Sequence, residues 1–322
     1  MRCTGMVSRI FFSVDVHGST LVWRKWIRAQ EMYKANVLVL SGDLTGKVLV
    51  PIVRHGDGTW TARYFGSRWV MKSESEVAAF EEKLEGAGAY YVRVDERELE
   101  ELKNNPDLVN RVMVEKMVER MRRWLELLVS KVDTRSVTTV VMPGNDDEWV
   151  IDGVIREYED RGVVYPLEKV FTVEKLEVVS SPYVNPTPWK TPREKDEKDL
   201  EKYLEKLISK LADPSKSIFN FHAPPYNTML DLAPKLTKDL RVVTVAGVPQ
   251  FEHVGSKAVR KVIEKYQPVI GLHGHIHESG GQDVIGRTVV VNPGSEYSEG
   301  VLKAYIVEVE GERLVNYYKI EG

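Results

Sequence analysis

Three histidines lie within five positions of one another, at His273, His275 and His277, although the whole chain contains only 7. Imidazole is a common metal ligand, and Gly274 allows the tight turn that would let His275 and His277 converge on one point. Solvated histidines in a surface turn would give the same residues. The cluster therefore indicates a metal site only in combination with further ligands elsewhere in the sequence.

Four more polar motifs precede this cluster, and each ends a short apolar run that is typical of a strand. Open α/β sheets bind their ligands at the carboxyl ends of their strands. We therefore expect the histidine cluster and these four motifs, which we call the five polar tips, to converge on one site. The four earlier motifs are Asp15-Val16-His17, Gly42-Asp43-Leu44-Thr45-Gly46, Gly144-Asn145-Asp146-Asp147 and Phe221-His222-Ala223-Pro224-Pro225.

The elements that must position these tips alternate between strand and helix, which predicts a layered α/β domain. The helix 106–131 has the clearest pattern, because its apolar residues recur at steps of three or four. The strands after Phe221 are expected to build a second sheet that packs face to face with the first. In the first half we place strands at 9–14, 37–40 and 137–142 and helices at 19–34 and 106–131; the later strands are 268–272, 288–291, 302–309 and 314–318, the last two forming a hairpin.

Residues 48–104 form an insertion within a single domain that spans residues 1–322. A hairpin at 48–64 turns near His55, and helices and a strand follow it. Because the insertion leaves directly after the Gly-Asp motif, we expect it to cap the site and limit substrate size. Its aromatic residues must bury against the main domain, a neighbouring subunit of a homo-oligomer or a ligand base. His55 either reaches the substrate or lies in a solvated turn.

Composition excludes several classes of function. The net charge of −3 gives no overall attraction to nucleic acid or to anionic membranes. The single cysteine, Cys3, cannot form an intrachain disulfide, which fits a reducing compartment. No run approaches 18 apolar residues, and the segment before Ser8 has too few apolar residues for a signal peptide. We expect a cytoplasmic protein that has no membrane partner and does not bind nucleic acid.

Other conspicuous residues have structural explanations. The proline-rich loop 181–189 is typical of a surface connection, with substrate contact as the alternative. The helix at 193–210 carries matched charges, which is typical of a solvated amphipathic helix. His253 is interpreted as a structural loop residue, and His273 either packs in the core or supports the histidine loop.

The order of these motifs along the chain resembles that of the calcineurin-like metallophosphoesterase superfamily. That order is Asp-x-His, Gly-Asp, Gly-Asn-x-Asp, His and Gly-His-x-His. The resemblance extends from Asp15 to about Ser295. The segments 221–231 and 274–294 are similar to a prokaryotic branch of predicted phosphoesterases related to cyclic-nucleotide phosphodiesterases. The resemblance implies a two-sheet β-sandwich flanked by helices, in four αββα layers, with the insertion as a cap-like subdomain. This α/β (α+β) fold agrees with the elements read from the chain.

The superfamily's site holds two divalent metal ions, and its ligands carry over residue by residue. One ion would take Asp15, His17 and His277, the other Asn145, His222 and His275, and Asp43 would bridge both. A hydroxide between the ions would attack the phosphorus, because two cations lower the pKa of a shared water. Manganese is favoured, with Fe, Ni, Co and Zn as alternatives. Asp43, Asn145, Asp146 and His275 are expected to act on the substrate.

The chain departs from the superfamily at Asp146, where many members have a histidine that contacts phosphate and can protonate the leaving group. Asp146 and Asp147 either face the substrate or cap the following helix. The motif Gly42-Asp43-Leu44-Thr45-Gly46-Lys47 also differs from that of protein phosphatases. The implied activity is metal-dependent hydrolysis of a small phosphoester, with diesters favoured over monoesters and a nucleotide as the favoured class. The alternatives are a metal- or nucleotide-binding scaffold with weak or absent catalysis, and a nuclease.

Overall fold

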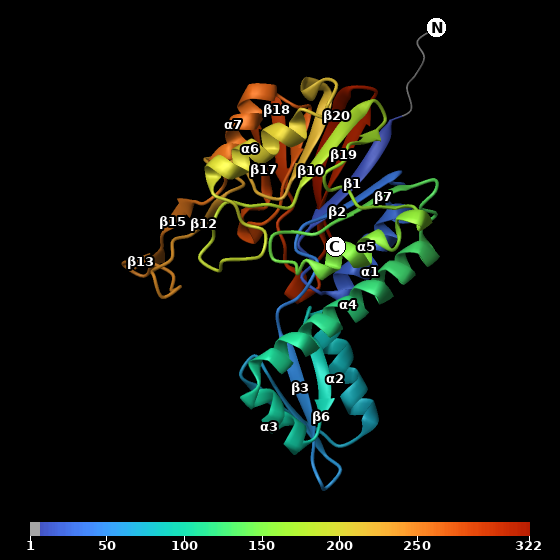
Figure 1. Ribbon diagram of the computed structural model, residues 1–322, viewed down its shortest axis with the longest axis vertical. Helices are drawn as coiled ribbons and strands as arrows, with labels where there is room; N and C mark the ends of the chain where they lie inside the picture. Colours follow the sequence, from blue (N-terminus) through green and yellow to red (C-terminus); the bar gives the residue numbers. More distant parts are fainter. Residues whose placement is uncertain (1–6) are drawn as a thin grey trace.

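The first of two large sheets gathers the N-terminal strands and the C-terminal hairpin. The computed structural model describes residues 7–322, and Cys3 lies outside them (Figure 1). Strands β1, β2, β7 and β8 are parallel, and β19 pairs antiparallel with β1. The strand order is β20 (Arg313–Glu321), β19 (Lys303–Glu310), β1 (Ser8–Val14), β2 (Val37–Ser41), β7 (Thr138–Met142) and β8 (Val163–Val164).

The second sheet is also mixed. Its central strands β10, β11, β16 and β18 are parallel, and β9 and β17 pair antiparallel at its two edges. The order is β17 (Gly281–Ile285), β18 (Thr288–Asn292), β16 (Ile270–Leu272), β11 (Ser217–Phe221), β10 (Leu176–Ser181) and β9 (Phe171–Val173). Because the parallel strands of each sheet share one direction, their carboxyl ends lie at one edge of that sheet.

The two sheets pack face to face, and helices cover both outer faces. Along β1, Ile10 and Phe12 enter the core between the sheets, whereas Phe11 packs outward against helices. This two-sided burial explains why β1 is a continuous apolar run. Helices α1 (Thr20–Met32), α4 (Pro106–Lys131) and α5 (Val150–Arg156) cover the first sheet, and α6 (Glu197–Ile208) and α7 (Lys257–Tyr266) cover the second (Figure 1). The predicted αββα architecture is confirmed.

The C-terminal hairpin corrects one expectation. Strands β19 and β20 join the first sheet, with β1 pairing along β19 from Ser8 with Val309 to Ser13 with Ala304. A sequence pattern shows that β19 is apolar, but it does not show which strand it pairs with. Ala304 to Val307 are all buried, because β19 is an interior strand with neighbours on both sides.

Helix ends follow local capping chemistry. The Ser19 hydroxyl accepts a hydrogen bond from Val22 N at 3.3 Å and begins α1. Asn105 caps α4 through a 3.0 Å bond from Leu108 N, and Pro106 occupies the first turn, where no backbone N–H is needed. The predicted bounds of α4 are those found. At 26 residues, this helix is about 39 Å long.

The insertion folds as a lobe with its own sheet and two small apolar cores, and it projects away from the sandwich (Figure 1). Helix α4 connects the two parts: its first turns pack on the lobe through Leu108 and Val109, and its later turns pack on the sandwich through Trp124 and Leu128. The sheet order is β5 (Ser67–Met71), β4 (Trp60–Tyr64), β3 (Leu49–Arg54) and β6 (Tyr90–Val94), with α2 (Glu74–Gly86) and α3 (Glu96–Asn104) beside it. Strand β5 was not anticipated, because Ser67 to Val70 are largely exposed and give no apolar run.

The remaining elements are short. A β arm between α6 and α7 contains β12 (Leu232–Pro234), β13 (Thr244–Val245), β14 (Val248–Pro249) and β15 (Phe251–His253), and single 3₁₀ turns lie at Glu159–Arg161, Pro214–Lys216, His277–Ser279 and Tyr297–Glu299. Within residues 7–322, no helix is both long enough and apolar enough to cross a membrane.

Candidate metal centre

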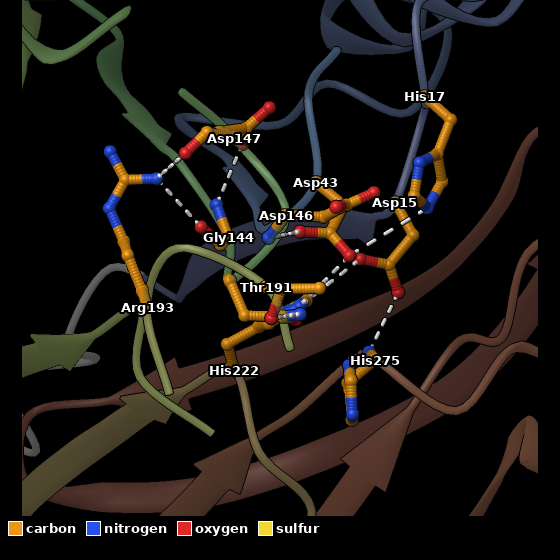
Figure 2. Close-up of polar contacts among 12 residues, drawn as sticks. Asp15, His17, Asp43, Gly144, Asp146, Asp147, Thr191, Arg193, His222 and His275 are labelled. Carbon is orange, nitrogen blue, oxygen red and sulfur yellow. Dashed lines mark hydrogen bonds and ion pairs between the residues drawn. The ribbon is translucent and has the colours of Figure 1, made fainter. Parts of the chain in front are cut away.

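The five polar motifs meet at the carboxyl ends of the parallel strands, where the two sheets face each other. Strands β1, β2 and β7 are followed by Asp15, Asp43 and the loop of Asn145, whereas β11 and β16 lead to His222 and to the loop of His275. Figure 2 shows Asp15, His17, Asp43, His222 and His275 gathered in one region from both sheets. The expected convergence is therefore present, and their function as metal ligands stays a prediction.

One group of three ligands combines Asp15, His17 and His277. One ligand atom from each lies within 4.8 Å of the other two. The Nε2 atoms of His17 and His277 are 3.0 Å apart. The backbone of the histidine loop orients Asp15, because the His275 N–H donates a 2.8 Å hydrogen bond to Asp15 Oδ2. Its Oδ1 atom is left to face the site.

A second group combines Asp43, His222 and His275, again with ligand atoms within 4.8 Å of one another. The Oδ2 atom of Asp43 lies 3.5 Å from His222 Nε2 and 3.7 Å from His17 Nε2, so this oxygen faces both groups. Its Oδ1 atom is held by Asp146 N at 2.9 Å. Asn145 completes the cluster: its Nδ2 donates to Thr191 Oγ1 at 2.8 Å, which leaves Oδ1 as the amide atom available to a ligand.

Four of these residues have a left-handed backbone, which is unusual for residues other than glycine. The φ angles are 54° at Asp15, 38° at His17, 27° at Asp43 and 70° at His275. Such conformations cost of order 1–3 kcal/mol each and persist where the surrounding structure requires them, often at functional sites. Their concentration at the strand tips favours a functional origin for the geometry.

Asp147 corrects the expectation that it caps the following helix. Helix α5 begins at Val150, and its N-cap residue is Trp149. The buried Asp147 carboxylate instead accepts hydrogen bonds from Leu44 N, Thr45 N, Thr45 Oγ1 and Gly144 N, at 2.9, 2.8, 2.6 and 2.8 Å. It therefore fixes the loop of Asp43 against the loop of Asn145.

The same two loops approach so closely that only glycine fits between them. A Cβ atom at Gly144 would lie 2.2 Å from Asp43 Oδ1, and one at Gly42 would lie 2.1 Å from the ring of His222. The buried Arg193 guanidinium supports the loops from outside by donating to Gly144 O at 2.9 Å and to Asp152 Oδ1 at 2.7 Å. Sequence reasoning placed Arg193 on a solvated helix, which is wrong because α6 begins only at Glu197.

Burial and neighbouring charges set the protonation states of the cluster. Burial lowers the pKa of His275 to about 4 and that of His277 to about 3, so both imidazoles are neutral near pH 7. Burial alone would lower the pKa of His222, but the carboxylates of Asp43 and Asp15 raise it to about 9. Burial raises the pKa of Asp15 to about 7. For Asp43 burial alone would raise the pKa, but the combined attraction of His222, His17 and His275 lowers it.

Several buried ligand atoms lack a hydrogen-bond partner among residues 7–322. They include Asp15 Oδ1, Asn145 Oδ1 and both ring nitrogens of His222. Leaving such an atom unpaired costs about 1–3 kcal/mol, so a cluster of them at one point is explained best by a ligand. Carboxylate, imidazole and amide donors in this number fit two divalent ions of the first transition series. The residues present therefore fit the metal centre that the resemblance implies.

Tyr297, Lys47 and Thr191 lie at the site but were missed by sequence reasoning. The ring of Tyr297 is 4.7 Å from that of His17, Lys47 Nζ is 3.3 Å from Asp146 Oδ1, and Thr191 holds Asn145. Thr191 lies two residues after the proline-rich loop, and Lys47 ends the Gly-Asp motif, but neither position carries a signal by itself. Tyr297 comes from a loop that only the fold brings to His17.

Three other histidines lie outside the cluster. His55 contacts Glu96 Oε1 at 2.9 Å and Thr61 Oγ1 at 2.7 Å within the lobe, so it does not reach the site. His253 contacts Asp231 Oδ1 at 2.7 Å, and it has a structural role as expected, but it ends strand β15 and does not lie in a loop. His273 is buried, and its Nδ1 lies 2.8 Å from Phe221 O and 2.9 Å from Ala223 O. It thereby supports the loop that carries His222.

Comparison with known proteins identifies the fold. No family model matches the chain. One curated relative, the uncharacterized protein MJ1162 of Methanocaldococcus jannaschii, is 41% identical over 128 residues, which is 39% of this chain and 51% of the relative. The chain thus matches about half the length of that relative. Two solved structures align over nearly their whole length.

The first covers 98% of this chain and 99% of its own, with a TM-score of 0.56 and 16% identity. The second, the crystal structure of TT1561 of Thermus thermophilus, covers 97% of this chain and 99% of its own, with a TM-score of 0.53 and 14% identity. The chain has the calcineurin-like metallophosphoesterase fold, as its motifs predicted.

Proposed function

We propose that the protein is a phosphoesterase that uses two divalent metal ions to hydrolyse a small phosphodiester, with manganese as the favoured metal. The observation that carries this proposal is the cluster of seven candidate ligand residues from both sheets, with unpaired atoms on Asp15, Asn145 and His222. When bound, two cations would polarise the phosphoryl oxygens and lower the pKa of a water molecule between them.

Each protein group in the cluster has a separate task. Asp43 directs its Oδ2 between the two groups of ligands, because the backbone of Asp146 holds its Oδ1. The neutral imidazoles of His275 and His277 offer nitrogen lone pairs without cancelling the positive charge that attracts a phosphate. Thr191 keeps the neutral carbonyl oxygen of Asn145 turned to the site, where another carboxylate would repel the substrate.

The preference for a diester follows from Asp146, which stands where many superfamily members have histidine. Its carboxyl group lies within 4.8 Å of the ligand atoms of His17 and Asp43. A phosphomonoester carries about −1.5 to −2 charges at pH 7, because its second pKa is near 6, whereas a diester carries one. An additional carboxylate therefore disfavours a monoester more than a diester.

We also propose that the lobe limits access through its β4–β5 turn and not through the β3–β4 turn. Strand β3 leaves the sandwich, so the turn that contains His55 lies at the far end of the lobe (Figure 1). Strand β4 runs antiparallel to β3 and so returns toward the sandwich, where Tyr64 at its end interacts electrostatically with Tyr297. Burial raises the pKa of Tyr64, and the nearby Tyr297 raises it further. Phe65, in the turn itself, is 80% exposed and free to contact a bound molecule.

A matched set of ester substrates tests this function. Protein loaded with Mn²⁺ should hydrolyse bis(p-nitrophenyl) phosphate faster than p-nitrophenyl phosphate, and a chelator should abolish both reactions. Asp43→Asn should lower the diesterase rate by about 100-fold or more, because it removes a charged ligand that faces both metal groups. Asp57→Asn, in the distal turn of the lobe, should leave the rate unchanged. Full activity in the presence of chelator would refute the proposal.

A further inference from the structure

We propose that Asp146 is itself a metal ligand, which supplies an additional carboxylate to the ion held by Asp15, His17 and His277. This inference rests on the proposed metal centre but concerns its composition, not its reaction. It gives a specific function to the residue at which the chain departs from the superfamily pattern.

The first argument is position. One oxygen of Asp146 lies within 4.8 Å of ligand atoms from both His17 and Asp43, so these three residues form a third group able to hold an ion. The backbone of Asp146 cannot easily move away, because its N–H donates to Asp43 Oδ1 at 2.9 Å. The backbone of Asp146 is therefore held against Asp43, and its carboxylate lies close to ligand atoms of both Asp43 and His17.

The second argument is the contact with Lys47. Its Nζ lies 3.3 Å from Asp146 Oδ1 and also donates to the backbone oxygen of Asp146. Carboxylates that bind metals commonly accept a second hydrogen bond, which orients them. A carboxylate has two oxygens, so one can accept from Lys47 while the other binds an ion.

The third argument is that folding alone does not explain Asp146. It does not cap helix α5, whose N-cap residue is Trp149. Its carboxylate is only 25% exposed and is placed close to the negative Asp43. Lys47 is the one cationic partner recorded for this carboxylate among residues 7–322. Holding like charges together inside a protein is unfavourable unless a cation lies between them.

The consequence is that the two metal positions differ in chemistry. The first would have carboxylates from Asp15, Asp43 and Asp146 with two imidazoles, whereas the second would have one carboxylate, one amide and two imidazoles. Oxygen-rich positions suit Mn²⁺ and Mg²⁺ better than Zn²⁺. We therefore expect the first position to be selective for Mn²⁺, and this selectivity to depend on residue 146.

The direct test places a thiolate at this position. Asp146→Cys protein, titrated with Cd²⁺, should show a thiolate-to-cadmium charge-transfer absorption band that the wild type lacks. The wild type also controls for Cys3, and Asp57→Cys controls for a thiol elsewhere on the surface. Two bound Cd²⁺ ions without the additional band would overturn the assignment.

A second measurement uses a milder variant in case Asp146→Cys does not fold. Asp146→Asn should weaken one of the Mn²⁺ positions by about 10- to 100-fold in calorimetric titration and should change the Zn²⁺ affinity less. Equal losses for both metals would indicate only a change of charge and would overturn the assignment, as would unchanged affinities. These experiments measure metal binding, so failure of the wild type to hydrolyse any ester would refute the proposed function alone.

Discussion

The buried carboxylate of Asp147 connects the two loops that carry Asp43 and Asn145, and its replacement by asparagine should destabilise the protein strongly. It accepts four hydrogen bonds: one from Leu44 N, two from the N–H and hydroxyl of Thr45, and one from Gly144 N. Asparagine has the same shape, but one oxygen becomes an NH₂ group that cannot accept. The least costly orientation points this NH₂ group at Thr45, because the Thr45 hydroxyl can rotate and accept.

The magnitude follows from the bonds that are lost. The Thr45 N–H is left buried without an acceptor, which costs about 1–3 kcal/mol. The bonds from Leu44 and Gly144 change from charged to neutral acceptors, which removes about 1 kcal/mol each. We therefore expect Asp147→Asn to lower the free energy of unfolding by about 3–5 kcal/mol, out of a total that is commonly about 5–15 kcal/mol.

Urea denaturation followed by circular dichroism in the presence of chelator would measure this change without a contribution from metal. Thr45→Val removes only the hydroxyl donor and should cost about 1 kcal/mol. Asp57→Asn is the matched control, because the Asp57 carboxylate also accepts from a backbone N–H and a threonine hydroxyl but is exposed. It should leave the unfolding transition unchanged. A loss below about 1 kcal/mol in Asp147→Asn would refute the assigned role.

Two further predictions concern backbone packing and pH. In Gly46→Ala the new Cβ atom would lie 2.0 Å from the backbone oxygen of Gly88, so the free energy of unfolding should fall by about 2 kcal/mol or more, whereas Gly56→Ala, with open space around it, should change it by less than about 0.5 kcal/mol. Equal effects of the two variants in urea titrations would contradict the predicted clash. In the metal-free protein the pKa values of Asp15, about 7, and His222, about 9, lie above the ordinary values of 3.8 and 6.5. Their contributions to stability are therefore complete in acid and are lost as the pH rises through about 7 and about 9. The melting temperature of the metal-free protein should fall between these pH values more steeply than that of the Mn²⁺-loaded protein, because bound metal displaces these protons; parallel pH profiles would exclude this linkage.

Much of the site was predictable because its signals are local. An apolar run that ends in a polar tip identifies both a buried strand and its carboxyl end, so Asp15, Asp43 and Asn145 could be placed on strands before any pairing was known. The ends of helix α4 are set by Asn105 and Pro106, which act within one turn of the chain. The order of the motifs then sufficed to indicate the superfamily's fold.

Other features depended on contacts between distant parts of the chain. The burial of Asp147 depends on Leu44 and Thr45, which are 103 and 102 residues away, so an acidic residue before a helix was naturally interpreted as a cap. In the same way, the sequence contains no sign that Arg193 is buried or that Tyr297 lies beside His17.

The sequence by itself therefore determined the strands that precede the five polar motifs, the motifs themselves and the types of ligand that the centre could use, because each of these depends on a few consecutive residues. The tertiary structure decided which strand β19 pairs with, where the lobe projects and which charges neighbour Asp146. The physical reason is that pairing, burial and the field at a carboxylate depend on residues brought together only when the two sheets close on each other.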